Sequence, residues 1–155
     1  MEIVDYLLGK KSGGGTDINE YFISNNVLES NLYPQSMIKK FPYNISLKNK
    51  STGSTMFYNF ANLESVVLRD CEDITNTNNM FANCLSLKFI DIRDLLYTNV
   101  TSGRMTIFGT LTGTDHIPYD CLIIVKDNEQ KQNLLSVPNF SRLTNIKTVE
   151  EYEQS

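Results

Sequence analysis

Residues 56–70 (MFYNFANLESVVLRD) and residues 80–94 (MFANCLSLKFIDIRD) align with each other when one segment is shifted by 24 residues. Met, Phe, Asn, Leu, Arg and Asp coincide at equivalent positions, and at two others isoleucine replaces valine or leucine. Self-similarity with a period of roughly 20–50 residues is typical of repeat proteins, in which each repeat buries its apolar face against its neighbours. The sequence therefore predicts a stacked repeat architecture, whereas it says little about a ligand.

Within each segment, three apolar residues follow the spacing L-x-x-L-x-L. They are Leu63, Val66 and Leu68, and then Leu87, Ile90 and Ile92. The last two of each set are two residues apart, so they share one face of a short strand. We expect the strands of successive repeats to form a parallel sheet whose apolar rows make one continuous core.

The residues between and after these apolar positions face the other side of the sheet. They are the candidate ligand-binding residues: Ser65, Val67, Arg69, Phe89, Asp91 and Arg93. A strand face of this kind is the usual binding surface of a stacked-repeat protein. The alternative is that these side chains are only solvated and bind nothing.

The pattern resembles the BspA-type leucine-rich repeat, which reads M-F-x-x-C-x-x-L-x-x-L-D-L-S-x-F-x-T-S-N-V-T. The residues that match are Met80-Phe81, Cys84, Leu87, Ile90-Asp91-Ile92 and Thr98-Asn99-Val100-Thr101. The likeness covers residues 56–101, is weaker after residue 117 and is absent before residue 48. The earlier repeat departs from the pattern, with Phe60 in place of Cys and Val67 in place of Asp.

This resemblance implies a strand-rich α/β fold, a short leucine-rich-repeat solenoid with a parallel sheet. It also implies a binding or surface protein, of the kind found in phages of low-GC Gram-positive bacteria and in mycoplasma-type surface lipoproteins. The end of the chain is similar to the C-terminal cap that closes such repeats in phage proteins.

The chain divides into an amphipathic helix at residues 1–8, a glycine-rich linker at 9–15 and a leucine-rich-repeat domain at 16–155. Repeats lie near 56–79 and 80–104, and a degenerate third lies near 105–125, where Ile107-Phe108 echoes Met-Phe. An irregular N-terminal cap precedes them, with a strand at 43–47. A C-terminal cap at 121–155 is expected to hold a strand at 121–125, a helix capped by Asp127 and a strand at 145–149.

The first eight residues carry an aliphatic stripe at helical spacing, formed by Ile3, Val4, Leu7 and Leu8. A helix this short is unstable alone. It therefore docks on a partner protein, or else it frays or folds back on its own domain.

Composition argues against several other classes of protein. The net charge of −4 gives no general attraction to nucleic acid, and no apolar run is long enough to span a membrane. Three cysteines in no C-x-x-C pattern favour buried thiols over disulfides or zinc. His116 is the single histidine, and the recurring aspartates follow from the repeat, so we expect no catalytic residue, metal or cofactor.

These features predict a non-enzymatic virion or cell-surface binding protein, a phage structural or adhesion component that displays its repeats for host recognition. Its partners would be other virion or surface proteins, through residues 1–8 and within a multimeric assembly, and a host polysaccharide or surface protein. The expected location is the virion, with the bacterial cell surface or cytoplasm as alternatives. A second possibility is a purely structural decoration protein of the head, tail or baseplate, with no host ligand.

Overall fold

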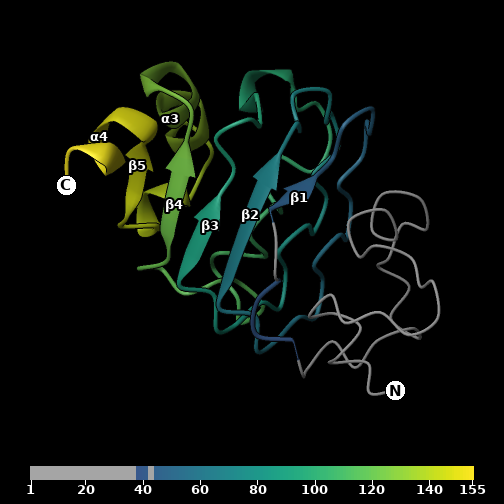
Figure 1. The fold of residues 1–155 in the computed structure, drawn as a ribbon. Helices are drawn as coiled ribbons and strands as arrows, with labels where there is room; N and C mark the ends of the chain where they lie inside the picture. The colour runs from purple at the N-terminus through teal and green to yellow at the C-terminus, as the bar shows by residue number, and fades with distance from the viewer. Residues whose placement is uncertain (1–37, 42–43) are drawn as a thin grey trace.

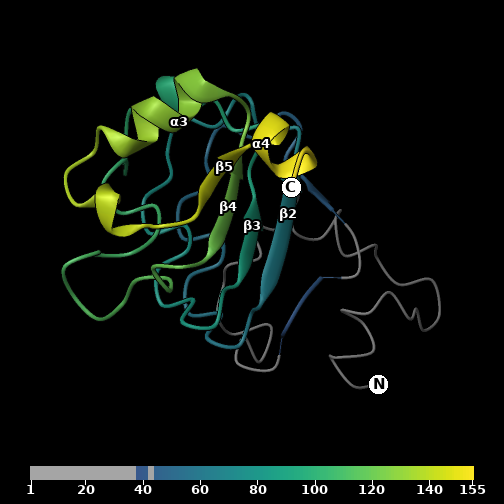
Figure 2. The ribbon, with the colours of Figure 1, turned by 90° about the vertical axis from the view of Figure 1, so that its left-hand side faces the viewer.

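The computed structural model describes residues 38–41 and 44–155, and its centre is a sheet of five parallel strands (Figure 1). The strands are β1 (Ile45–Ser46), β2 (Ser65–Arg69), β3 (Phe89–Asp91), β4 (Leu122–Val125) and β5 (Ile146–Thr148). Their order in the sheet is their order in the chain. Since neighbouring strands are parallel, each connection returns behind the sheet to start the next strand (Figure 2).

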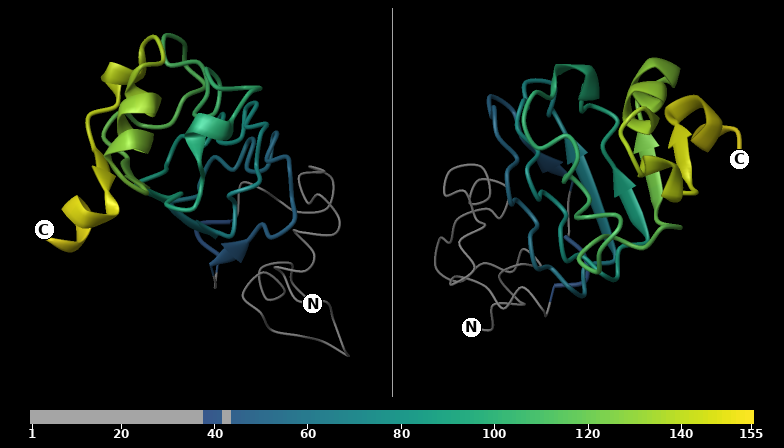
Figure 3. Two further views of the ribbon diagram at one scale, coloured as in Figure 1. Left: turned by 90° about the horizontal axis from the view of Figure 1, so that it is seen from above. Right: turned by 180° about the vertical axis from the view of Figure 1, so that it is seen from behind.

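The predicted strand-rich α/β class is confirmed, and in the described part of the chain only short helices accompany the sheet. They are α3 (Asn128–Leu135), α4 (Val149–Glu153) and the 3₁₀ helices η2 (Tyr97–Asn99) and η3 (Phe140–Arg142). Seen from above, the returning segments fill the space behind the sheet, while α4 extends toward its front (Figure 3).

The pairing of β2 with β3 reproduces the 24-residue shift of the sequence. Val66 is the register partner of Ile90, and Val67 is the partner of Asp91. Ile90 in turn pairs with Ile123, and Ile123 with Ile146, so one aliphatic row crosses four strands. The period found in the sequence is therefore the spacing of the hydrogen-bonded ladder.

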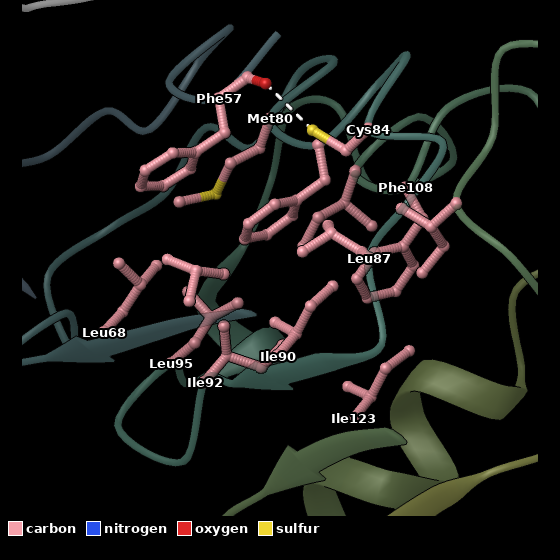
Figure 4. Close-up of a cluster of buried hydrophobic side chains, with 14 of the residues drawn as sticks. Phe57, Leu68, Met80, Cys84, Leu87, Ile90, Ile92, Leu95, Phe108 and Ile123 are labelled. Carbon is pink, nitrogen blue, oxygen red and sulfur yellow. Dashed lines mark hydrogen bonds between the residues drawn. The ribbon is translucent and has the colours of Figure 1, made fainter. Parts of the chain in front are cut away.

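The six apolar residues predicted to form the ladder are all buried, with at most 2 % of their surface exposed. Figure 4 shows Leu68, Ile90 and Ile92 facing Phe57, Met80 and Cys84 across the core. The Met-Phe pairs thus form the wall opposite the sheet, where each segment packs against the next one.

That opposite wall is built from stacked phenylalanines. The rings of Phe57 and Phe81 are 5.4 Å apart between centroids and nearly parallel, and Phe81 stacks on Phe108 at 6.1 Å. The backbone follows the same stacking: Phe57 N donates to Met80 O and Phe81 N to Ile107 O, both at 2.8 Å. Phe108 lies 27 rather than 24 residues after Phe81, so the inserted residues do not disrupt the stacking of these two rings.

The C-terminal segment contains the predicted helix and one that was not predicted. Asp127 caps α3 by accepting a hydrogen bond from Gln130 N, and Leu134 is buried against the core. The expected strand at 145–149 is only Ile146–Thr148, because Thr148 caps α4 and forms a capping box with Glu151. The strand expected at 43–47 is likewise reduced to Ile45–Ser46.

The expected helix at residues 1–8, the linker at 9–15 and most of the N-terminal cap lie outside the described residues. Within the part of the chain that is described, no helix is long and apolar enough to cross a membrane.

Candidate binding surface

The sheet face turned away from the core carries the residues that the sequence assigned to ligand binding. In β2, the core residues Val66 and Leu68 alternate with half-buried Ser65, Val67 and Arg69. Strand register aligns Val67 with Asp91, Asp91 with Ile124, and Ile124 with Lys147. The candidate residues therefore lie side by side on one face, as the alternation of a strand requires.

Helix α4 covers the part of this face that lies over β4. Ile124, although it belongs to the outer row, is fully buried. Tyr152 of α4 contacts the ring of Phe89 at 5.8 Å between centroids. The open part is consequently the area over β2 and β3, which we call the outer patch and which comprises Ser65, Val67, Arg69, Phe89, Arg93 and Tyr152. Figure 1 shows α4 beside β5, with β2 and β3 uncovered in front.

Tyr152 was missed by the sequence reasoning because α4 was missed. The sequence did contain a signal, since Thr148 and Glu151 have the T-x-x-E spacing of a capping box at the start of a helix.

Asp91 differs from the other five predicted residues because it is buried, with only 3 % of its side chain exposed. It lies between two arginines. Arg69 approaches through Nη1 to Oδ1 and Nη2 to Oδ2, both at 3.2 Å. Arg93 donates from Nη2 to Oδ2 at 2.8 Å and from Nε to both oxygens at 3.1 Å. A ligand on the patch therefore meets the two guanidinium groups, while Asp91 holds them in place.

The electrostatics of this trio favour charged arginines. Hydrogen bonding to Asp91 raises the pKa of Arg93 above its usual value, and burial of the side chain acts in the opposite sense. Within the trio, one carboxylate against two guanidinium groups leaves one net positive charge, and the nearby carboxylates of Asp94 and Glu153 also act on Arg93. Arg69 and Arg93 expose 29 % and 26 % of their side chains, so this charge is presented outward.

An acidic group borders the patch at the carboxyl ends of the strands. Oxygens of Asp70, Glu72 and Asp94 lie within 4.8 Å of one another. Asp94 accepts a hydrogen bond from Asp70 N at 2.8 Å, and Ser46 Oγ donates to Asp70 at 2.7 Å. Two of these carboxylates are thus bonded to the chain itself, and we assign no metal to them.

A shallow pocket of about 170 Å³ lies at the same edge of the sheet. Its lining combines both charges with two aliphatic side chains: Glu72, Arg93, Asp94, Leu96, Lys126 and Val149. Arg93 is therefore shared between the pocket and the outer patch.

The cysteine side chains are poor nucleophiles in this fold. All three are buried and free, and burial raises the pKa of Cys84 and of Cys121 to about 12. Burial also raises the pKa of Cys71. The Cys84 thiol donates to Phe57 O at 2.9 Å, which fixes it in the core (Figure 4). The burial predicted for these thiols is confirmed.

His116 is held by local contacts. Its ring stacks on Tyr119 with 4.4 Å between centroids, and Nδ1 lies 2.6 Å from Ile117 O. Neither contact is to a side chain that could serve as a nucleophile.

Comparison with models of known protein families, with curated proteins and with solved structures finds no match for this chain.

Proposed function

We propose that residues 16–155 form a leucine-rich-repeat solenoid of the BspA-like kind. The observation that carries this proposal is the 24-residue register, which appears both in the sheet and on the opposite wall. Val66 pairs with Ile90 in the sheet, and on the other side Thr52 pairs with Asn76 in a parallel bridge, both across 24 residues. In a stacked-repeat protein, each repeat contacts the next one along its whole length, so contacts are expected on both walls.

The function we propose is non-enzymatic binding on the surface of a virion or a bacterial cell, with the outer patch as the ligand-contacting surface. The support is the character of the described groups: half-buried arginines on an open sheet face, thiols with raised pKa and a histidine held by stacking. Such a surface is suited to recognition, because its charged groups are fixed by a rigid sheet.

The second part of the proposal concerns attachment. Ile3, Val4, Leu7 and Leu8 would dock on another virion or surface protein, and the glycines at 13–15 would separate that contact from the displayed domain. Many copies on one scaffold would strengthen weak binding of the domain to a host polysaccharide or protein through avidity.

Surface display is tested with an antibody raised against residues 44–155 and applied to intact cells and purified particles of the source organism. We expect labelling without permeabilisation. Labelling that appears only after cells are opened, and on no particle, would contradict the proposal. If particles are labelled but an antibody specific for the outer patch does not bind to them, the result would instead favour a purely structural virion component.

Attachment is tested by deleting residues 1–12 from the full chain. We expect the melting temperature to stay unchanged, while the protein is lost from the particle or cell-surface fraction. A second variant combines Ile3→Glu with Leu7→Glu, which keeps the chain length and interrupts the apolar stripe. It should be lost from the same fraction as the deletion variant. Unfolding of the deletion variant would show that these residues belong to the core, and the attachment proposal would then be wrong.

A further inference from the structure

We propose that the outer patch binds an acidic glycan, with a carboxylate or phosphate group held by Arg69 and Arg93 and a sugar ring lying against Phe89. This inference rests on the proposed surface-binding function and names its class of ligand. It is carried by the unused donors of the two arginines, by the burial of their counter-ion and by the apolar side chains beside them.

The two guanidinium groups retain hydrogen-bond donors that no group in residues 38–41 and 44–155 uses. Arg69 donates through Nη1 and Nη2 to Asp91 and Leu68 O, and Arg93 through Nε and Nη2 to Asp91. Among the described residues, neither Arg69 Nε nor Arg93 Nη1 has a hydrogen-bond partner. A guanidinium group favours planar oxyanions because its donors match their geometry.

Burial of Asp91 makes the trio attractive to an anion. The carboxylate lies beneath the arginines and is 3 % exposed, so an approaching ligand meets positive groups first. Its bonds also fix both side chains in advance, which lowers the entropy lost when a ligand binds.

Apolar side chains adjoin the arginines on the same face. Ser65 pairs with Phe89 and Val67 with Asp91, so Val67 and Phe89 are diagonal neighbours across β2 and β3. The negative face of an aromatic ring attracts the C–H groups of a sugar, so an acidic sugar fits the combination of a ring and a cation.

The patch has two arginines and two aromatic rings, but none of its large apolar side chains is fully exposed. Hot spots in protein interfaces centre on large apolar or aromatic anchors. The exposed large apolar residues of the described chain are Tyr58, Leu85 and Met105, and none of them belongs to the outer patch. The exposed polar groups of the patch are charged hydrogen-bond donors, so we assign an acidic glycan as its occupant.

The acidic edge of the sheet limits how many anionic groups the patch accepts. Glu72 and Asp94 line the pocket that Arg93 also lines. Their charge opposes a second anion near Arg93, so we expect Glu72→Gln to tighten binding of the anionic ligand.

The test is isothermal titration calorimetry of the full chain with three polymers: oligogalacturonate, which carries carboxylates, phosphorylated maltooligosaccharide and neutral maltooligosaccharide. We expect one or both anionic polymers to bind and the neutral one not to. Arg69→Ala should weaken binding about ten- to a hundredfold, because a charge-assisted hydrogen bond is lost. Arg69→Ala leaves Arg93 paired with Asp91, so the fold is retained, and melting temperature checks this.

The matched control is Arg142→Ala, which removes the same charge from an exposed position in η3. Unchanged affinity in this variant supports the proposal, and an equal loss in both variants overturns it. The proposal is also overturned if neither anionic polymer binds, or if the neutral polymer binds equally well. Loss of binding in Phe89→Ala together with full binding in Arg69→Ala would overturn it too. Each of these failures leaves the surface-labelling result untouched, so the two proposals fail separately.

Discussion

The side-chain amide of Asn83 donates a hydrogen bond to the side-chain oxygen of Asn59, 2.8 Å away and 24 residues earlier in the chain. Both residues have left-handed backbone conformations, with φ of 60° and 68°. Asparagine tolerates this conformation better than other residues with a Cβ, because its side chain bonds locally. Asparagine at this position thus adopts the turn conformation within each segment and also forms the hydrogen bond between the two segments.

Replacing Asn83 with alanine should remove both contributions. We expect the free energy of unfolding to fall by about 2–3 kcal/mol, from a strained left-handed residue and a lost hydrogen bond. Asn83→Gly is the control, because glycine accepts the conformation and loses only the bond. Urea denaturation distinguishes the two variants, and equal losses would show that the conformation does not matter.

The buried ladder makes a second prediction, which uses two leucines in the same segment. Leu87 is fully buried, whereas Leu85 is 49 % exposed. Leu87→Ala should lower the free energy of unfolding by about 2–5 kcal/mol, because it leaves a cavity in the core. Leu85→Ala should change it by no more than about 0.5 kcal/mol. Chemical denaturation of the two variants gives the comparison, and similar losses would mean that the core is placed wrongly.

The attachment of α4 to α3 should depend on pH. The pKa of Glu151 is lowered from 4.5 to about 2, because its carboxylate accepts a hydrogen bond from Thr148 N and pairs with Lys131 at 2.9 Å. A lowered pKa in the folded state means a stabilising contribution that is present above about pH 4.5 and is lost as the pH falls toward about 2.

The ring contact between Phe89 and Tyr152 reports this attachment. In an NMR titration from neutral to acid pH, we expect the ring signals of Tyr152 to shift near pH 2. Lys131→Met should move the transition upward, toward the usual carboxyl pKa. A transition near 4.5 in the natural chain, unaffected by Lys131→Met, would contradict the assignment.

Much of this fold follows from side-chain periodicity, because alternation along a strand determines which residues enter the core. Val66 and Leu68 could be assigned to the core for that reason, and Leu63 from the L-x-x-L-x-L spacing of the repeat. The helix after Asp127 could be predicted from its capping residue. The same reasoning placed Arg69 and Asp91 on one face, but it could not give their different exposure. That difference arises because Arg69 at the end of β2 and Arg93 in the turn after β3 converge on one carboxylate. The contact of Arg69 with Asp91 joins residues 22 apart, which no local pattern encodes.

Strand ends were less predictable than strand positions. The strand before Val149 stops early because the capping box of Thr148 and Glu151 competes with continued pairing. The resulting helix brings Tyr152 onto the outer face, so the candidate surface gained a residue that the repeat pattern alone does not contain.

If the 24-residue segment is a stacking unit, the chain should accept a second copy of it without loss of its fold. A second copy of residues 56–79 is inserted between Asn79 and Met80, and thermal unfolding is followed by circular dichroism. Because each stacked unit contributes its own interface, we expect one cooperative transition at or above the melting temperature of the natural chain. The control inserts residues 56–67 at the same place, which puts the following strands out of register. If the duplicated chain melts at a temperature as low as this control, or without cooperativity, the 24-residue segment is not a stacking unit.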